Sequence, residues 1–285
     1  MGIIIPLLFI LICCLIIWKA SDGFEVSSEY LGRNMSDGVR GATINAIASS
    51  MPELFTTIFF LLYLKDTDGF SGGIGTTAGS AIFNGMIIPA VVIFAVLYTK
   101  IATEIKVSKK VILRDGLSLI AAETILIFLI SGDTLNWWHG FILMITYGVY
   151  VTYMLTTMST VESNEPDEEE EEDELENKSF FNSLVTLDLE SLIIGKNKIN
   201  NKNGWTLLII SMLVIGLACL ILVAACEMIG SESYSLPFIG ELNGLNIPIM
   251  FIAVVLASAA TSVPDTIISV RDARKGNYND AISNA

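Results

Sequence analysis

Two carboxylates stand in strongly apolar stretches of the chain, each directly after a proline. Glu53 ends the run SSMPE and Asp265 ends the run TSVPD. In a helix, Ser49 and Glu53 share one face at i, i+4, as do Thr261 and Asp265. Their hydroxyl and carboxylate oxygens, with carbonyls that the proline frees, are hard ligands that suit calcium or sodium better than zinc or copper. The pattern therefore predicts a cation site.

The two runs belong to an internal repeat. Residues 41–53 align without gaps with residues 253–265, with identical pairs at Ala48/Ala260, Ser50/Ser262 and Pro52/Pro264. A carboxylate inside a membrane span costs about 2.5 to 3.5 kcal/mol, which makes a repeated one a candidate for function. The repeat predicts that both carboxylates share one site, where they repel each other unless cations neutralise them.

A second polar patch lies between residues 75 and 84. Gly75 and Gly79 are spaced for close helix packing, and Ser80 and Asn84 follow at i, i+4. We expect Ser80 and Asn84 to present oxygens to the cavity that contains Glu53. The alternative is that they only form hydrogen bonds with a neighbouring helix.

Composition excludes two classes of protein. The chain has 285 residues, 53% of them hydrophobic, with a mean hydropathy of +0.64 and a net charge of -14. Eleven carboxylates lie in the range 162–176, and outside it 19 acidic residues stand against 16 basic ones. Neither a soluble globular enzyme nor a basic nucleic-acid binder has this composition. The sequence also lacks a nucleophile–base pair, a phosphate loop and a Cys/His metal motif, so we expect no enzyme.

Apolar runs long enough to cross a bilayer predict an all-α polytopic membrane protein. We expect seven spans, at about 3–19, 38–64, 73–98, 111–131, 136–159, 205–229 and 247–270. This arrangement places every Lys and Arg except Lys65 on one side, which predicts an outside amino terminus and a cytoplasmic 160–204 loop. The two repeats then cross the membrane in opposite directions, as in secondary transporters.

The acidic segment divides the chain into parts. Residues 1–159 form a five-span half with the first repeat at 41–84, and residues 205–285 a partial second half with an incomplete repeat at 253–285. The 160–204 insert is too polar to build a core, so we expect a disordered cytoplasmic linker. Weak calcium binding or a cytoplasmic partner are its alternative roles. The four cysteines fall inside predicted spans and are interpreted as small apolar residues.

At these motifs the chain resembles the cation/calcium exchanger superfamily, the sodium/calcium exchanger membrane region. That family carries two alpha-repeats of the form G-A-T…[ST]-S-x-P-[ED], followed by G-S and then an Asn or Asp. The first repeat is nearly complete here from Gly41 to Asn84, the second is recognisable from Ala253 onward, and the Arg114–Asp115 pair is also similar. The resemblance implies an inverted-repeat antiporter fold with ten spans. We therefore expect a fragment of a longer exchanger, cut before a second glycine-serine helix.

The resemblance implies antiport of calcium against sodium across the plasma membrane or an inner membrane, without a cofactor. Access would alternate by sliding of spans one and six. The implied ion-binding residues are Glu53, Asp265, Ser49, Ser50, Ser80, Asn84, Thr261 and Ser262. The Glu-then-Asp choice is similar to the potassium-dependent exchangers, so potassium is a further candidate ion. Proton-coupled calcium exchange and a non-transporting membrane scaffold with a partner-binding or calcium-buffering insert stay as alternatives.

Three departures from the family pattern are relevant to the site. Ala48 and Ala260 stand where the family usually has Gly. Asn45 replaces an apolar residue on the Ser49/Glu53 face and is an additional candidate ligand. Glu123, in the predicted fourth span, has no family counterpart and is a candidate for binding a proton or a polar partner.

Overall fold

The computed structural model describes residues 2–33, 49–102, 104–105, 109–132, 134–158, 183, 186–195, 198–237 and 239–276. In these residues the chain is mostly helical. Four helical stretches are long and apolar enough to cross a membrane, namely Ile4–Gly32, Thr67–Tyr98, Asn201–Gly230 and Ile249–Arg271. Met51–Tyr63 and Gly116–Ile130 are shorter apolar helices. The mostly helical class is thus confirmed, whereas the count of seven spans stays a prediction.

The amino-terminal half contains six α-helices among its described residues. In chain order they are α1 (Ile4–Gly32), α4 (Met51–Tyr63), α5 (Asp66–Ile82), α6 (Ile88–Tyr98), α7 (Lys109–Ile130) and α8 (Trp137–Met158). A π-helical turn, Phe83–Ile87, joins α5 to α6, so the predicted third span is one long helix with a bulge. The first helix extends well beyond the predicted span 3–19. Of the predicted second span, residues 38–48 lie outside the described part of the chain.

The carboxy-terminal part has one long helix and one broken helix. The elements are α10 (Leu189–Ile193), α11 (Asn201–Gly230), strands β1 (Ser233–Leu236) and β2 (Gly240–Asn243), α12 (Ile249–Ile252), a π-helical turn at Ala253–Ala257, α13 (Ser258–Thr261) and α14 (Val263–Lys275). The antiparallel hairpin β1–β2 connects α11 to α12, and the Tyr234 hydroxyl donates to the Gly2 carbonyl before α1. The predicted seventh span therefore corresponds to four consecutive helical segments.

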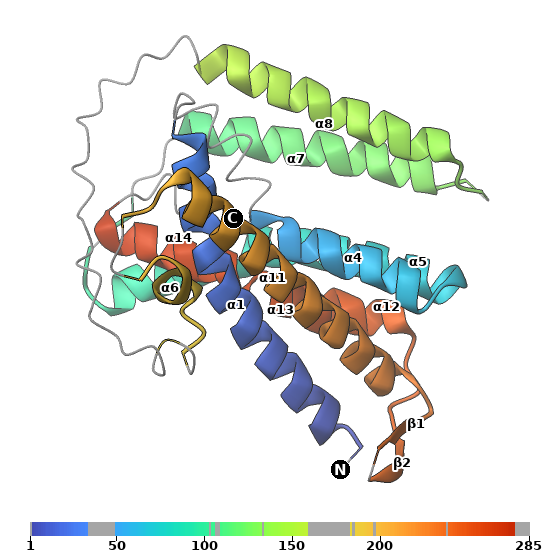
Figure 1. Ribbon diagram of the computed structural model, residues 1–285. Coiled ribbons are helices and arrows are strands. Elements are labelled where there is room, and N and C mark those ends of the chain that lie inside the picture. Colours follow the sequence, from blue (N-terminus) through green and yellow to red (C-terminus); the bar gives the residue numbers. More distant parts are fainter. Residues whose placement is uncertain are drawn as a thin grey trace.

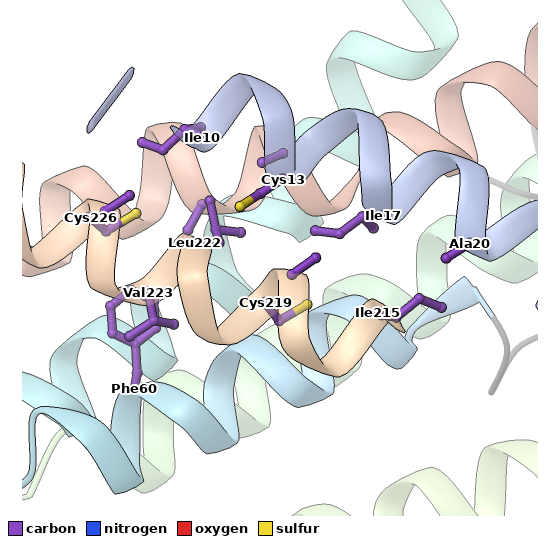
Figure 2. Packing of buried hydrophobic residues seen from close by; sticks show 14 of the residues in the cluster. Ile10, Cys13, Ile17, Ala20, Phe60, Ile215, Cys219, Leu222, Val223 and Cys226 are labelled. Carbon is purple, nitrogen blue, oxygen red and sulfur yellow. The ribbon is translucent and has the colours of Figure 1, made fainter. Parts of the chain in front are cut away.

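The core lies between α1 and α11, which pack side by side (Figure 1). On α1, buried Ile10, Cys13, Ile17 and Ala20 follow a spacing of three and four residues, which places them on one helix face. Figure 2 shows this face against Ile215, Cys219, Leu222 and Cys226 of α11, with Phe60 of α4 beside Val223. All four cysteines are free thiols in or beside this core, which agrees with their interpretation as small apolar residues.

Part of the 160–204 insert is folded. Helix α10 begins after Asp188, whose side chain accepts from the Ser191 backbone N–H at 3.1 Å. Leu189 and Ile194 are buried in the same core as α1 and α11. The expectation of a disordered linker is therefore not met at residues 186–195, where apolar residues return after the acidic run. The acidic run 162–176 itself lies outside the described residues.

Helices α7 and α8 pack against each other and lie to one side of α4 and α5 (Figure 1). Large apolar side chains on both helices are exposed, including Leu113, Phe128 and Met144. In a protein with membrane-spanning helices, such faces are suited to contact lipid. Glu123 lies half-buried on α7.

Candidate ion-binding site

The two sequence repeats have the same backbone break. Ser50 has φ -86° and ψ 2°, and Ser262 has φ -88° and ψ 0°, so the helix is interrupted at equivalent positions. After each break the helix restarts with a proline in its first turn. The Ser50 carbonyl accepts from Leu54 N–H at 3.0 Å and the Ser262 carbonyl accepts from Thr266 N–H at 3.1 Å. The repeat seen in the sequence is therefore also a repeat of local structure.

These breaks place each carboxylate in the first turn of a new helix. Glu53 lies in the first turn of α4, and Asp265 in the first turn of α14. A helix amino terminus carries a partial positive charge and free backbone N–H groups, which favour a negative side chain there. The restart after each Ser-x-Pro thus offsets part of the cost of holding a carboxylate inside an apolar protein.

Helix α5 brings the second polar patch to these two breaks by packing closely on the second repeat. A Cβ atom at Gly75 would lie 2.8 Å from the Met250 carbonyl oxygen. At Gly79 it would overlap the Val254 carbonyl oxygen and lie 2.7 Å from Ser258 Oγ. The predicted close packing through these two glycines is confirmed. Asn84 follows in the π-helical turn Phe83–Ile87, a type of distortion that occurs often at functional sites.

Three side chains from three segments form one hydrogen-bonded group. Ser80 Oγ lies 2.9 Å from Ser262 Oγ and 3.2 Å from Glu53 Oε1, and Ser262 Oγ lies 3.5 Å from the same carboxylate oxygen. A hydroxyl has one proton, so Ser262 donates to Ser80 when Ser80 donates to Glu53. The group joins the first repeat to the second through α5.

Asp265 lies at the other end of this group and is 5% exposed. The Asn84 amide Nδ2 donates to Asp265 Oδ2 at 3.5 Å. The Asp265 and Glu53 carboxyl groups are close enough to interact electrostatically. The structure thus brings together five residues that the sequence singles out, namely Glu53, Ser80, Asn84, Ser262 and Asp265.

Three oxygens of this cluster are buried without a hydrogen-bond partner. They are Glu53 Oε2, Asp265 Oδ1 and Asn84 Oδ1. A buried polar atom that lacks a partner costs roughly 1 to 3 kcal/mol, and more when it is charged. Carboxylate and amide oxygens are the ligands that calcium and sodium prefer. The donor set therefore fits a hard cation.

The other predicted ligands are not part of the hydrogen-bonded cluster just described. Thr261 is buried and donates to the Ser258 carbonyl at 3.1 Å. The Ser50 side chain is exposed, unlike its repeat partner Ser262. Ser49 is half-buried in the turn before α4. Their roles as ligands stay predictions. Asn45 lies outside the described residues, and Glu123 lies on α7, which packs against α8.

One neighbour of the cluster has no counterpart among the predicted residues. Glu25 of α1 interacts electrostatically with Asp265. The proximity arises from the packing of α1 against α13 and α14, which hydropathy alone does not predict. The available signal was the helical spacing of Asp22, Glu25 and Glu29 directly after an apolar run.

Comparisons with known proteins agree with these features. The family model described as sodium/calcium exchanger protein matches residues 5–156 and 203–285. Sodium/potassium/calcium exchanger 3 of Mus musculus is 32% identical over 122 residues, which cover 42% of this chain and 17% of that protein. Sodium/potassium/calcium exchanger Nckx30C of Drosophila melanogaster is 33% identical over 130 residues, covering 46% and 14%.

The matched part spans less than a fifth of the length of these relatives. No solved structure matches the chain significantly. The family model, however, covers well over half of the chain and includes both carboxylate motifs. The chain therefore belongs to the sodium/calcium exchanger family of membrane transporters.

Proposed function

We propose that the chain forms the ion-binding part of a secondary antiporter that exchanges calcium for sodium. The observation that carries this proposal is the group of unpartnered buried oxygens of Glu53, Asp265 and Asn84. They come from both repeats and from the helix between them, so one ion can contact all three segments. The names of the relatives include potassium, which makes potassium a third candidate substrate here.

Charge balance explains how such a site supports exchange. Two ionised carboxylates carry a charge of -2, which one calcium ion or two sodium ions would neutralise. The empty site is unfavourable, because two close negative charges in a medium of low dielectric repel each other. Calcium and sodium therefore compete for the same two carboxylates, and competition for one site couples their movements.

The remaining ligands follow from the preference of calcium for six to eight oxygens. We propose the hydroxyls of Ser80, Ser262 and Thr261 as neutral ligands, with Ser49 and Ser50 contributing hydroxyl or carbonyl oxygens. The Ser80–Ser262 contact at 2.9 Å lies beside Glu53, so binding of an ion there would rearrange the hydrogen bonds between the halves. This would give the ion a means to change how the two repeats pack.

We propose α1 and α11 as the elements that move during alternating access. They pack against each other, and each also contacts a carboxylate helix: α11 contacts α4, and α1 contacts α14. The distribution of Lys and Arg supports an outside amino terminus and a cytoplasmic 160–204 loop in the plasma or an inner membrane.

The test begins with calcium binding by the purified chain in detergent, measured by titration with radioactive calcium. We expect saturable binding that sodium competes for and that Glu53→Gln weakens about 100-fold, because the variant removes one of two charges that face the ion. Calcium uptake into proteoliposomes then separates the coupling ions. A sodium gradient should drive uptake, whereas uptake driven only by a pH gradient would indicate proton coupling.

A deletion of residues 162–176 serves as the matched control. The antiporter proposal expects unchanged high-affinity binding in this variant, since all the proposed ligands lie outside the acidic run. If the deletion abolished calcium binding while Glu53→Gln left it intact, the chain would be a scaffold with an acidic calcium-buffering insert, and the antiporter proposal would be wrong.

A further inference from the structure

The two helix breaks differ in the hydrogen bonds that their backbone carbonyls accept. The Ser262 carbonyl accepts from the Thr266 backbone N–H at 3.1 Å and from the Thr266 hydroxyl at 2.9 Å. A carbonyl oxygen has two lone pairs, so Thr266 uses both of them. The Ser50 carbonyl accepts from the Leu54 backbone N–H at 3.0 Å, and the Leu54 side chain has no hydroxyl that could add a second bond. Leu54 therefore leaves one lone pair of the Ser50 carbonyl unused.

The side chains of the same two serines differ in the opposite sense. Ser262 Oγ is buried and lies 2.9 Å from Ser80 Oγ and 3.5 Å from Glu53 Oε1. Ser50 is exposed. The second break thus directs its hydroxyl into the cluster while Thr266 occupies its carbonyl. The first break has an exposed side chain and a carbonyl that Leu54 occupies only in part.

Residues 54 and 266 occupy equivalent positions in the repeat, each directly after the carboxylate. A threonine hydroxyl in a helix can donate to the carbonyl four residues earlier, which a leucine side chain cannot do. The φ and ψ angles of Ser50 and Ser262 are nearly equal. The type of side chain at residues 54 and 266, and not the backbone, therefore produces the difference in hydrogen bonding.

We propose that Thr266 is a positioning residue that makes the two breaks contribute different ligands to the ion. Because Thr266 binds the Ser262 carbonyl, Ser262 contributes its hydroxyl, whereas Ser50 contributes its carbonyl. The inference rests on the proposed function, because it requires an ion at the cluster. Hydroxyl and carbonyl oxygens are both neutral hard ligands, so each repeat supplies one of them beside its carboxylate.

The experiment changes the hydrogen bonding at each of the two positions in the full chain and measures calcium affinity by titration. Leu54→Thr places a hydroxyl where it can donate to the Ser50 carbonyl, and we expect it to weaken calcium binding about tenfold. Leu54→Val is the matched control, because valine resembles threonine in shape but lacks the hydroxyl, and should stay within about twofold of the wild type. Leu54 is 50% exposed, so neither substitution disturbs a packed core.

The reciprocal change should act in the opposite direction. Thr266→Val frees the second lone pair of the Ser262 carbonyl and should strengthen calcium binding about threefold, because the ion gains an oxygen ligand. Thr266→Ser keeps a hydroxyl and should stay within about twofold of the wild type. A purely structural role of the Thr266 hydroxyl would instead give weaker binding in Thr266→Val.

Equal calcium affinities of Leu54→Thr and Leu54→Val would overturn the inference, and so would unchanged or weaker binding in Thr266→Val. If Glu53→Gln still weakened binding in that case, the proposed function would stand. A wild-type chain that binds no calcium would overturn both. Thermal unfolding followed by circular dichroism checks that the variants fold, and the two Leu54 variants supply the test if Thr266→Val does not fold.

Discussion

The two repeats have the same backbone conformation at their helix breaks but differ in how deeply their side chains are buried. Ser262 and Asp265 are 0% and 5% exposed, whereas Ser50 is exposed and Glu53 is half-buried. The motifs at both breaks are similar, so the difference comes from the neighbouring helices: the first copy packs against α5 and α11, and the second against α5 and α1. The local sequence thus determines where each helix breaks, and the packing of neighbouring helices determines how deeply each copy of the repeat is buried.

Each of the two long helices, α1 and α11, packs against the repeat that belongs to the other half of the chain. Helix α11 of the second half packs on α4 of the first, and α1 of the first half packs on α13 and α14 of the second. Each carboxylate helix therefore rests on the other half of the chain. A relative movement of the halves would change the surroundings of both carboxylates together, which alternating access requires.

The largest expected effect comes from the buried member of the carboxylate pair. Asp265→Asn should weaken calcium binding about 100-fold or more and at least as much as Glu53→Gln, because Asp265 is the more enclosed of the two. Calcium titration of both variants measures this, with Glu241→Gln on the exposed hairpin as a control. Normal binding in Asp265→Asn beside lost binding in Glu53→Gln would show that only the first repeat forms the site.

Close packing between α5 and the second repeat should be the next most sensitive feature. Gly79→Ala forces a methyl group against the Val254 carbonyl oxygen and should lower the free energy of unfolding by about 2 kcal/mol. Gly85→Ala has open space around it and should change stability by less than about 0.5 kcal/mol. Thermal unfolding in detergent compares the two. Equal stabilities would mean that the helices are not in close contact.

The two serines at the breaks offer a direct test of the difference in burial. Ser262→Ala removes a hydroxyl that contacts both Ser80 and Glu53, and should weaken calcium binding about tenfold. Ser50→Ala, at the exposed equivalent position, should stay within about twofold of the wild type. Calcium titration again gives the measurement. The opposite ranking would imply that ions contact the first break and that its exposure is functional.

Much of the site could be predicted from sequence, because a proline and a short polar run act locally. The Ser-x-Pro motif indicated both breaks, and the spacing of Gly75 and Gly79 indicated the close packing that brings Ser80 to Ser262. These features depend on residues within one or two helical turns of each other. Their repetition provided a second, independent indication that both carboxylates belong to one site.

The remainder depended on contacts between distant segments. The packing of α1 on α13 and α14 brings Glu25 within electrostatic reach of Asp265, and hydropathy carries no information on how helices cross. The burial of Leu189 and Ile194 in the core could not be predicted either, because the acidic run dominates the average composition of the insert. Composition averages over a segment, whereas a few apolar residues suffice to anchor it.

The smallest effect is expected where α1 and α14 are joined by charge. Arg271 and Asp22 lie 3.9 Å apart with side chains 54% and 34% exposed, so solvent screens the pair, and Lys19 gives Asp22 a second partner. A double-mutant cycle of Arg271→Gln and Asp22→Asn, measured by thermal unfolding, should give a coupling free energy of less than about 0.5 kcal/mol that falls further in high salt. A coupling above about 1 kcal/mol would show that charge, and not packing, holds α1 on the second repeat.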